Sequence, residues 1–186
     1  MATKQQQPAG TPGEYGRVQR DLSSMPPGEL VCQVKNHQAE DVIVLSKVLI
    51  SVVGKEEAGK LISKARYDIY HKAGKKVAER LGNPKDLDSY LEEYFLKSPR
   101  PEAPVWIAPG EFIYRTKNKA VRRTSNYCFK AEAFKRFADK EMLEFLGKYY
   151  CVHDIAWAEG FNPNMKIKLT KSFLFGDPYC EFTVEV

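Results

Sequence analysis

Thiols and carboxylates recur together at short spacings in the last third of this 186-residue chain. Cys128 precedes Glu132 by four residues. Cys151 precedes Asp154 by three residues, and a further thiol, Cys180, lies near the C-terminus. Residues three or four apart on a helix share a face, so each pair would present a thiol beside a carboxylate. We expect these five side chains to converge on one polar site.

Such a site supports nucleophilic catalysis if one thiol is activated. A thiolate attacks an electrophilic carbon, while a neighbouring carboxylate or imidazole removes the thiol proton or orients the sulfur. Asp154 is the expected partner of Cys151. His153 could reach a bound ligand, although a position on the helix surface is the commoner case for such a histidine.

A zinc site is a second interpretation of the same residues. Zinc takes thiolate and carboxylate ligands, and catalytic sites leave one position open for water. Cys128, Cys151 and Cys180 would then be the metal ligands, although their spacings lack the close C-x2-C pairs of zinc fingers. A third interpretation leaves the thiols separate in the core, because free cysteines are often buried.

Composition argues against several classes of function. A chain with 43% hydrophobic and 28% charged residues suits one soluble domain. The net charge of +5 comes from basic residues spread along the chain, whereas nucleic-acid binding needs a clustered basic stripe. No apolar run has the length of a membrane span, and the N-terminus lacks a signal-peptide layout. We expect a cytoplasmic, bacterial protein that binds neither nucleic acid nor a membrane.

The N-terminal segment differs in composition from the rest of the chain. Residues 1–27 are rich in Gln, Gly, Pro and Ser, and such a segment buries too little apolar surface to offset the entropy of ordering it. We expect a flexible arm here, one that could pack on a partner subunit in a homo-oligomer. Residues 28–186 would form a single domain.

Apolar periodicity predicts the secondary structure of that domain. The first helix ends at Gly54 and carries an apolar stripe formed by Val42, Leu45, Val48, Leu49 and Val52. Further helices are expected at 55–81, 87–96, 128–137 and 142–158. Two strands are expected at 112–115 and 120–124, joined at Lys117-Asn118. Alternating apolar residues predict a strand at 165–175, and a final strand is expected at 180–186 after the Gly176-Asp177-Pro178 turn. The order predicts an α+β fold, with an antiparallel sheet, helices packed on one face and a helical N-terminal half.

Four motifs in the C-terminal part carry a resemblance to a known family. They are Cys128-x3-Glu132, Tyr150-Cys151-x2-Asp154, Gly160-Phe161-Asn162-Pro163 and Gly176-Asp177-x2-Cys180. In order and spacing this set resembles the L-2-amino-thiazoline-4-carboxylic acid hydrolase family. The last motif is also similar, over a shorter stretch, to the end of the 4-vinyl reductase domain, a small-molecule-binding module that can carry zinc.

The resemblance implies a hydrolase that opens a carbon–nitrogen bond in the ring of a small carboxylate. Cys151 would be its nucleophile or a metal ligand, and Asp154 would orient it or act as the base. Cys128, Glu132 and Cys180 would complete the site. Arg122 or Arg123 would hold the substrate carboxylate.

The chain departs from the family pattern at two places. Phe129 stands where many members have proline, and Glu181-Phe182 stands where many have Asp-His. These departures keep open an alternative function, a non-hydrolytic small-molecule- or metal-binding protein on the same scaffold.

Overall fold

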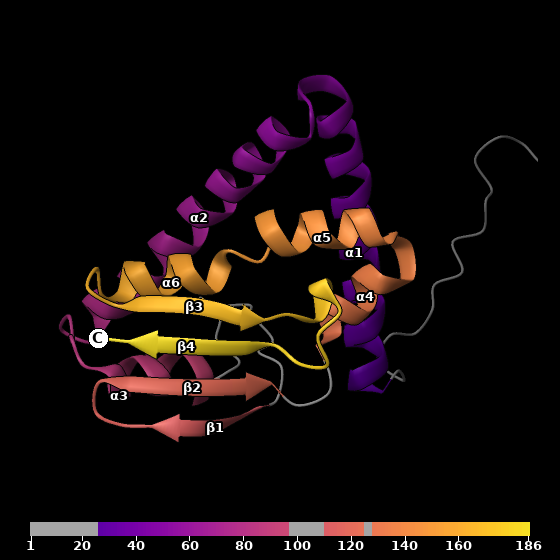
Figure 1. Ribbon diagram of the computed structural model, residues 1–186. Helices are drawn as coiled ribbons and strands as arrows, with labels where there is room; N and C mark the ends of the chain where they lie inside the picture. The colour runs from indigo at the N-terminus through magenta and orange to yellow at the C-terminus, as the bar shows by residue number, and fades with distance from the viewer. Residues whose placement is uncertain (1–25, 97–109, 125–127) are drawn as a thin grey trace, which may run out of the picture.

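Two long helices begin the part of the chain that the computed structural model describes, which comprises residues 26–96, 110–124 and 128–186. Helix α1 (Pro27–Val53) and helix α2 (Lys55–Arg80) meet at Gly54. The φ angle of Gly54 is 82°, in the left-handed region that favours glycine. The two helices diverge from this joint (Figure 1).

The remaining helical segments are short, and side-chain caps begin some of them. They are α3 (Leu87–Leu91), the π-helical turn η2 (Glu92–Leu96), α4 (Phe129–Phe137), α5 (Lys140–Tyr149), α6 (His153–Phe161) and the 3-10 turn η3 (Phe173–Phe175). Asp86 accepts the Ser89 N–H at 2.7 Å and starts α3, and Asp139 accepts the Met142 N–H at 2.8 Å and starts α5.

Four strands form one antiparallel sheet in the order β1-β2-β4-β3. They are β1 (Gly110–Arg115), β2 (Lys119–Thr124), β3 (Lys166–Lys171) and β4 (Glu181–Glu185). The C-terminal strand β4 therefore lies in the middle of the sheet, between β2 and β3 (Figure 1). This arrangement confirms the predicted α+β class.

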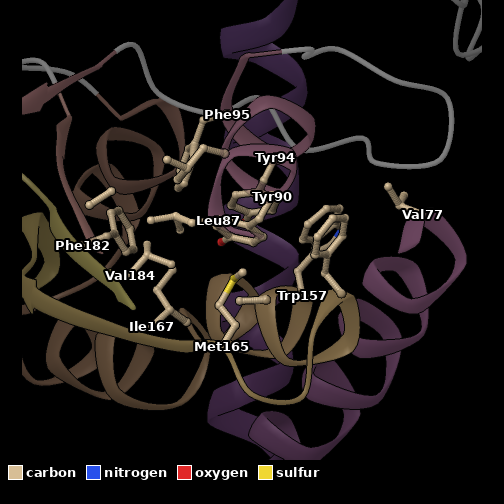
Figure 2. Close-up of a cluster of buried hydrophobic side chains, with 14 of the residues drawn as sticks. Val77, Leu87, Tyr90, Tyr94, Phe95, Trp157, Met165, Ile167, Phe182 and Val184 are labelled. Atoms are coloured by element: carbon tan, nitrogen blue, oxygen red, sulfur yellow. The ribbon is translucent and has the colours of Figure 1, made fainter. Parts of the chain in front are cut away.

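One face of the sheet is covered by helices and forms the first core. Along β2 the side chains of Ala120, Arg122 and Thr124 are buried, as are Phe182 and Val184 on β4. Residues from the C-terminal half of α2, from α3 and η2, and from α6 pack against this face. Figure 2 shows the side chains of this core, in which the α3 and η2 aromatics meet those of α6 and the sheet.

A second core lies between α1, α4, α5 and η3. It contains Phe134, Phe145, Leu146 and Leu174, all buried. Cys180 packs against both cores, because it lies just before β4 where the sheet meets η3. The region between the two cores is therefore where the thiols of the sequence motifs gather.

The predicted helix at 142–158 is wrong, because the chain forms two helices there. Helix α5 ends at Tyr149, and the amides of Tyr150 and Cys151 both bond to the Leu146 carbonyl, at 2.9 Å and 3.2 Å. This shared acceptor ends the regular helical pattern without any proline or glycine. Cys151 therefore lies in a turn, and only Asp154 lies in a helix.

The strand predicted at 165–175 is also shorter than expected. It ends at Lys171, and Phe173–Phe175 forms η3 instead. The Ser172 side chain accepts the Leu174 N–H at 3.2 Å, and the Asp177 carboxylate accepts the Ser172 N–H at 2.8 Å. These side-chain hydrogen bonds replace the strand's ladder and turn the chain toward Cys180.

Helix α1 begins at Pro27, the last residue of the expected N-terminal arm, and residues 1–25 lie outside the described part of the chain. The predicted apolar stripe of α1 matches its buried face only in part, since Val42 and Leu49 pack against the second core. Ala39, Ile43 and Ser46 are buried, while Leu45, Val48 and Val52 are 55–73% exposed. The helix is apolar on two sides, and only one packs against α2 and α4.

Candidate functional site

Cys151 lies in the turn between α5 and α6, and a cation on α2 holds this turn in place. The Arg66 Nε donates to the Tyr150 carbonyl at 2.6 Å, and the Arg66 guanidinium lies 3.5 Å from the centre of the Tyr150 ring. Phe134 packs edge-on against the same ring. Fixing Tyr150 from both sides fixes the position of the next residue, Cys151.

The Cys151 thiol lies in a confined environment shared with the other motif residues. Burial raises the pKa of Cys151 to about 12, while the nearby Lys130 ammonium acts in the opposite direction. Negative charge on Asp154, Cys128 or Cys180 would also raise this pKa. The three late thiols and one carboxylate are therefore close enough to influence one another's protonation. Without a ligand, Cys151 is a thiol rather than a thiolate.

Asp154 is the acidic group of the site. Its side chain is 13% exposed, and the Tyr94 hydroxyl donates to Oδ1 at 2.6 Å. Burial raises the pKa of Asp154, although the Tyr94 hydrogen bond and the charges of Lys130 and Arg122 oppose that shift. A buried carboxylate with a raised pKa accepts a proton more readily than an ordinary aspartate does.

Cys128 and Cys180 border the site from α4 and from the sheet. Cys128 is the N-cap residue of α4. At the end of β2 the Thr124 N–H donates to the Cys180 carbonyl at 2.9 Å, and the Cys180 N–H donates to the Thr124 hydroxyl at 2.9 Å. The Cys180 Sγ accepts the Phe173 N–H at 3.5 Å. Burial raises the pKa of Cys180 to about 11. Cys180 is therefore a protonated thiol near neutral pH.

Two other residues predicted for the site point elsewhere. Glu132 lies on α4 and forms an ion pair with Lys135 at 3.1 Å on the surface. Arg123 lies on the opposite face of β2 from its buried neighbour Arg122, where it pairs with Glu181 at 2.9 Å. Of the two arginines predicted to hold a substrate carboxylate, only Arg122 therefore faces this site, since side chains alternate across a strand.

Arg122 and His153 do lie at the site. The Arg122 guanidinium is buried over the Phe95 ring, 4.6 Å from its centre, and its charge acts on Asp154. His153 is buried rather than exposed on the helix surface, with Nε2 3.4 Å from Asp154 Oδ2 and 3.2 Å from Lys130 Nζ. Burial, together with the charges of Lys130 and Arg66, lowers the pKa of His153 well below its usual value.

Sequence reasoning missed three side chains that contact or influence the candidate site: Lys130, Tyr94 and Arg66. Each is brought to Cys151 or Asp154 by tertiary packing, as when Tyr94 bonds to a carboxylate 60 residues away. The position of Lys130, two residues after Cys128, was the one local signal for any of them. Lys130 lies on the first turn of α4 and acts on Cys151, Asp154 and His153 alike.

Comparison with known protein families decides the relationship. Residues 34–184 match the L-2-amino-thiazoline-4-carboxylic acid hydrolase family. The chain belongs to this family. The match confirms the family resemblance that the four motifs indicated. It covers most of the chain, so it also includes most of the helical N-terminal half, which lies before the first motif. No curated protein and no solved structure matched in the corresponding searches.

The structure explains the Gly160-Phe161-Asn162-Pro163 motif without assigning it chemistry. Gly160 lies against the backbone of α2 at His71, where a Cβ atom would overlap the carbonyl. Asn162 is buried, donates to the Lys85 carbonyl at 2.8 Å and accepts the Asn164 N–H at 3.0 Å. This family motif therefore packs α6 on α2 and closes the turn before β3.

The zinc interpretation gains no support from the geometry. Across residues 26–96, 110–124 and 128–186, no group of three or more His, Cys, Asp or Glu side chains is arranged to hold a metal ion. The three thiols approach one another without forming such a cluster. In the same described ranges, no helix is long and apolar enough to cross a membrane.

Proposed function

We propose that this member of the family hydrolyses a carbon–nitrogen bond in the ring of a small cyclic carboxylate, with 2-amino-thiazoline-4-carboxylate as the substrate that the family name indicates. The observation that carries the proposal is the meeting of Cys151, Asp154 and Lys130 between the two cores. A nucleophile, a base and a fixed positive charge are the groups that acyl-type transfer at such a carbon requires.

The reaction begins at the carbon between the ring sulfur and the ring nitrogen. Cys151 sulfur forms a bond to this carbon while its proton passes to Asp154. The ring carbon–nitrogen bond then breaks, and Asp154 returns the proton to the departing nitrogen. Water attacks the same carbon, Asp154 takes its proton, and Cys151 leaves to recover that proton. The net change is addition of one water across the ring bond, which leaves a carbamoyl-cysteine product.

The electrostatics of the site suit this sequence of proton transfers. Burial raises the pKa of Asp154, which makes this carboxylate a better proton acceptor, whereas the raised pKa of Cys151 opposes loss of the thiol proton. The Lys130 charge favours the thiolate as it forms. A cationic amidine group of the substrate, bound next to Asp154, would make the ring carbon more electrophilic.

Replacing Cys151 by alanine tests the proposal. We expect turnover of 2-amino-thiazoline-4-carboxylate to fall by at least 10²-fold, because the covalent step is lost, while the far-UV circular dichroism spectrum is unchanged. Cys32→Ala is the matched control, since Cys32 lies on α1 and is not among the groups that act on Cys151. Wild-type turnover in Cys151→Ala would contradict the nucleophilic role, and no turnover by the wild type would contradict the hydrolase.

A second candidate function, non-hydrolytic binding of a small molecule, is favoured by one observation. A thiol with its pKa raised to about 12 is a weak nucleophile unless the bound ligand changes its environment. If the wild type binds 2-amino-thiazoline-4-carboxylate and returns it unchanged, this candidate replaces the hydrolase. Mass spectrometry of the recovered ligand distinguishes the two.

A further inference from the structure

Four helices each contribute one basic side chain to the surroundings of Lys130 and the Tyr150-Cys151 turn. They are Lys35 on α1, Arg66 on α2, Lys130 on α4 and His153 on α6. Lys130 Nζ lies 3.2 Å from His153 Nε2, and the Arg66 and Lys130 cations approach the same Tyr150 ring. Burial and then the Lys130 charge lower the pKa of Lys35, so these two amines are also neighbours.

The hydrogen-bond donors of this group outnumber the acceptors around it. An ammonium group only donates, so the neutral His153 ring accepts from Lys130 at Nε2 and carries its proton on Nδ1. His153 Nδ1 is enclosed and, in the described part of the chain, has no hydrogen-bond partner. The same holds for Arg66 Nη2. Burying a donor without an acceptor is costly, so such groups indicate a missing partner.

Negative charge is scarce at this place. Within the described ranges, no carboxylate lies at ion-pair distance from Lys130 or Arg66. The nearest acid is Asp154, whose Oδ1 is already bonded to Tyr94 and whose Oδ2 lies 3.4 Å from His153 Nε2. Lys130 and Arg66 are half-buried, so an anion bound between them would be less screened by solvent than one on the open surface.

We propose that Arg66, Lys130 and His153 form the subsite that binds the carboxylate of the small-molecule ligand, and that Lys35 adds positive charge beside Lys130. The proposal rests on the proposed function, because it identifies the ligand's anionic group with the carboxylate of the cyclic substrate. Arg66 Nη2, His153 Nδ1 and the Lys130 ammonium are the donors. A ligand held in this way presents its ring to Cys151 and its cationic end to Asp154 and Tyr94, so the site selects small zwitterionic carboxylates.

Binding of a carboxylate that cannot be hydrolysed tests the subsite apart from the reaction. Isothermal titration of the full-length protein with thiazolidine-4-carboxylate, which has the ring and the carboxylate but no amidine, should show binding. Thiazolidine without the carboxylate should not bind. Lys130→Met should weaken binding of the acid about tenfold, which corresponds to loss of one charge-assisted hydrogen bond. Arg66→Gln should do the same, but it also removes the bond to Tyr150.

Arg123→Gln is the matched control, because Arg123 is a cation on the outer face of the sheet. Equal binding of the acid by wild type and Lys130→Met, or no binding by the wild type, would overturn the subsite. The two proposals fail separately. Tight, Lys130-dependent binding without turnover of 2-amino-thiazoline-4-carboxylate overturns only the hydrolase. Turnover with a KM that is unchanged in Lys130→Met overturns only the subsite.

Discussion

Replacing Gly160 by alanine is expected to destabilise the folded domain by about 3 kcal/mol, at the upper end of the usual cost of forcing atoms into a packed core. Gly160 on α6 meets α2 at His71, and an added Cβ would overlap the carbonyl group there. On α2, Gly74 meets the Trp157 carbonyl in the same way. The two helices therefore touch backbone to backbone, and a methyl group can be accommodated only by separating them.

Urea unfolding, followed by circular dichroism, measures this effect. Lys72→Ala is a suitable control, because Lys72 follows His71 on α2 but is exposed to solvent. Its replacement should change the unfolding free energy by less than about 0.5 kcal/mol. Separation of α6 from α2 would also displace Asp154, so turnover should fall in Gly160→Ala. A variant with wild-type stability would show that the helices can move apart without cost.

The parts of the fold that could be predicted are those with local signals. The α2 helix has an apolar period and ends before Asn83, which adopts a positive φ of 59°, as the Gly82-Asn83-Pro84 stop indicates. The β1–β2 hairpin likewise follows from alternation. The break after α5 has no local signal, because Tyr150-Cys151-Val152 contains no glycine or proline. The buried side of α1 also depends on tertiary packing, since apolar residues lie on both of its sides.

The same division applies to the candidate site. The pairing of Cys151 with Asp154 was predicted on a helix face, whereas a turn followed by a helix start brings them together. Arg122 and Arg123 are neighbouring arginines that the sequence alone does not distinguish. Because side chains alternate across strand β2, only Arg122 points toward the core. Tyr94 and Arg66 reach the site across 60 and 84 residues of sequence. No spacing rule covers such contacts, because they are set by how α2, η2 and α6 pack.

Asp154→Asn is expected to separate function from stability. Turnover of 2-amino-thiazoline-4-carboxylate should fall by about 10² to 10⁴-fold, the usual loss when a general base is removed. The asparagine amide can still accept the Tyr94 hydroxyl, so the local structure is retained. The buried negative charge is gone, and the folded protein should become more stable at neutral pH.

The sign of this stability effect depends on pH. Burial raises the folded-state pKa of Asp154 above its ordinary value of 3.8, so the folded protein holds this proton more tightly than the unfolded chain does. The raised pKa of Asp154 therefore contributes to the free energy of unfolding in full below pH 3.8, and this contribution is lost as the pH rises through the raised pKa. Relative to wild type, Asp154→Asn should therefore gain stability with increasing pH and reach a constant advantage above the raised pKa.

Asp86→Asn provides a control with the opposite sign. The pKa of Asp86 is lowered, chiefly by the backbone hydrogen bond that it accepts from Ser89, so its charge stabilises the fold at neutral pH and is lost in acid. Urea unfolding of the wild type and both variants from about pH 2 to pH 8 gives the two slopes, because the Asp86 effect lies below the ordinary pKa of 3.8 and the Asp154 effect lies above it. A pH-independent difference between wild type and Asp154→Asn would show that the Asp154 pKa is not raised in the folded protein. Retained turnover would show that another group removes the proton.

A gain in stability combined with loss of turnover would mean that the fold keeps an unfavourable buried carboxylate because the chemistry needs it. That relation is expected of a catalytic base rather than of a structural aspartate.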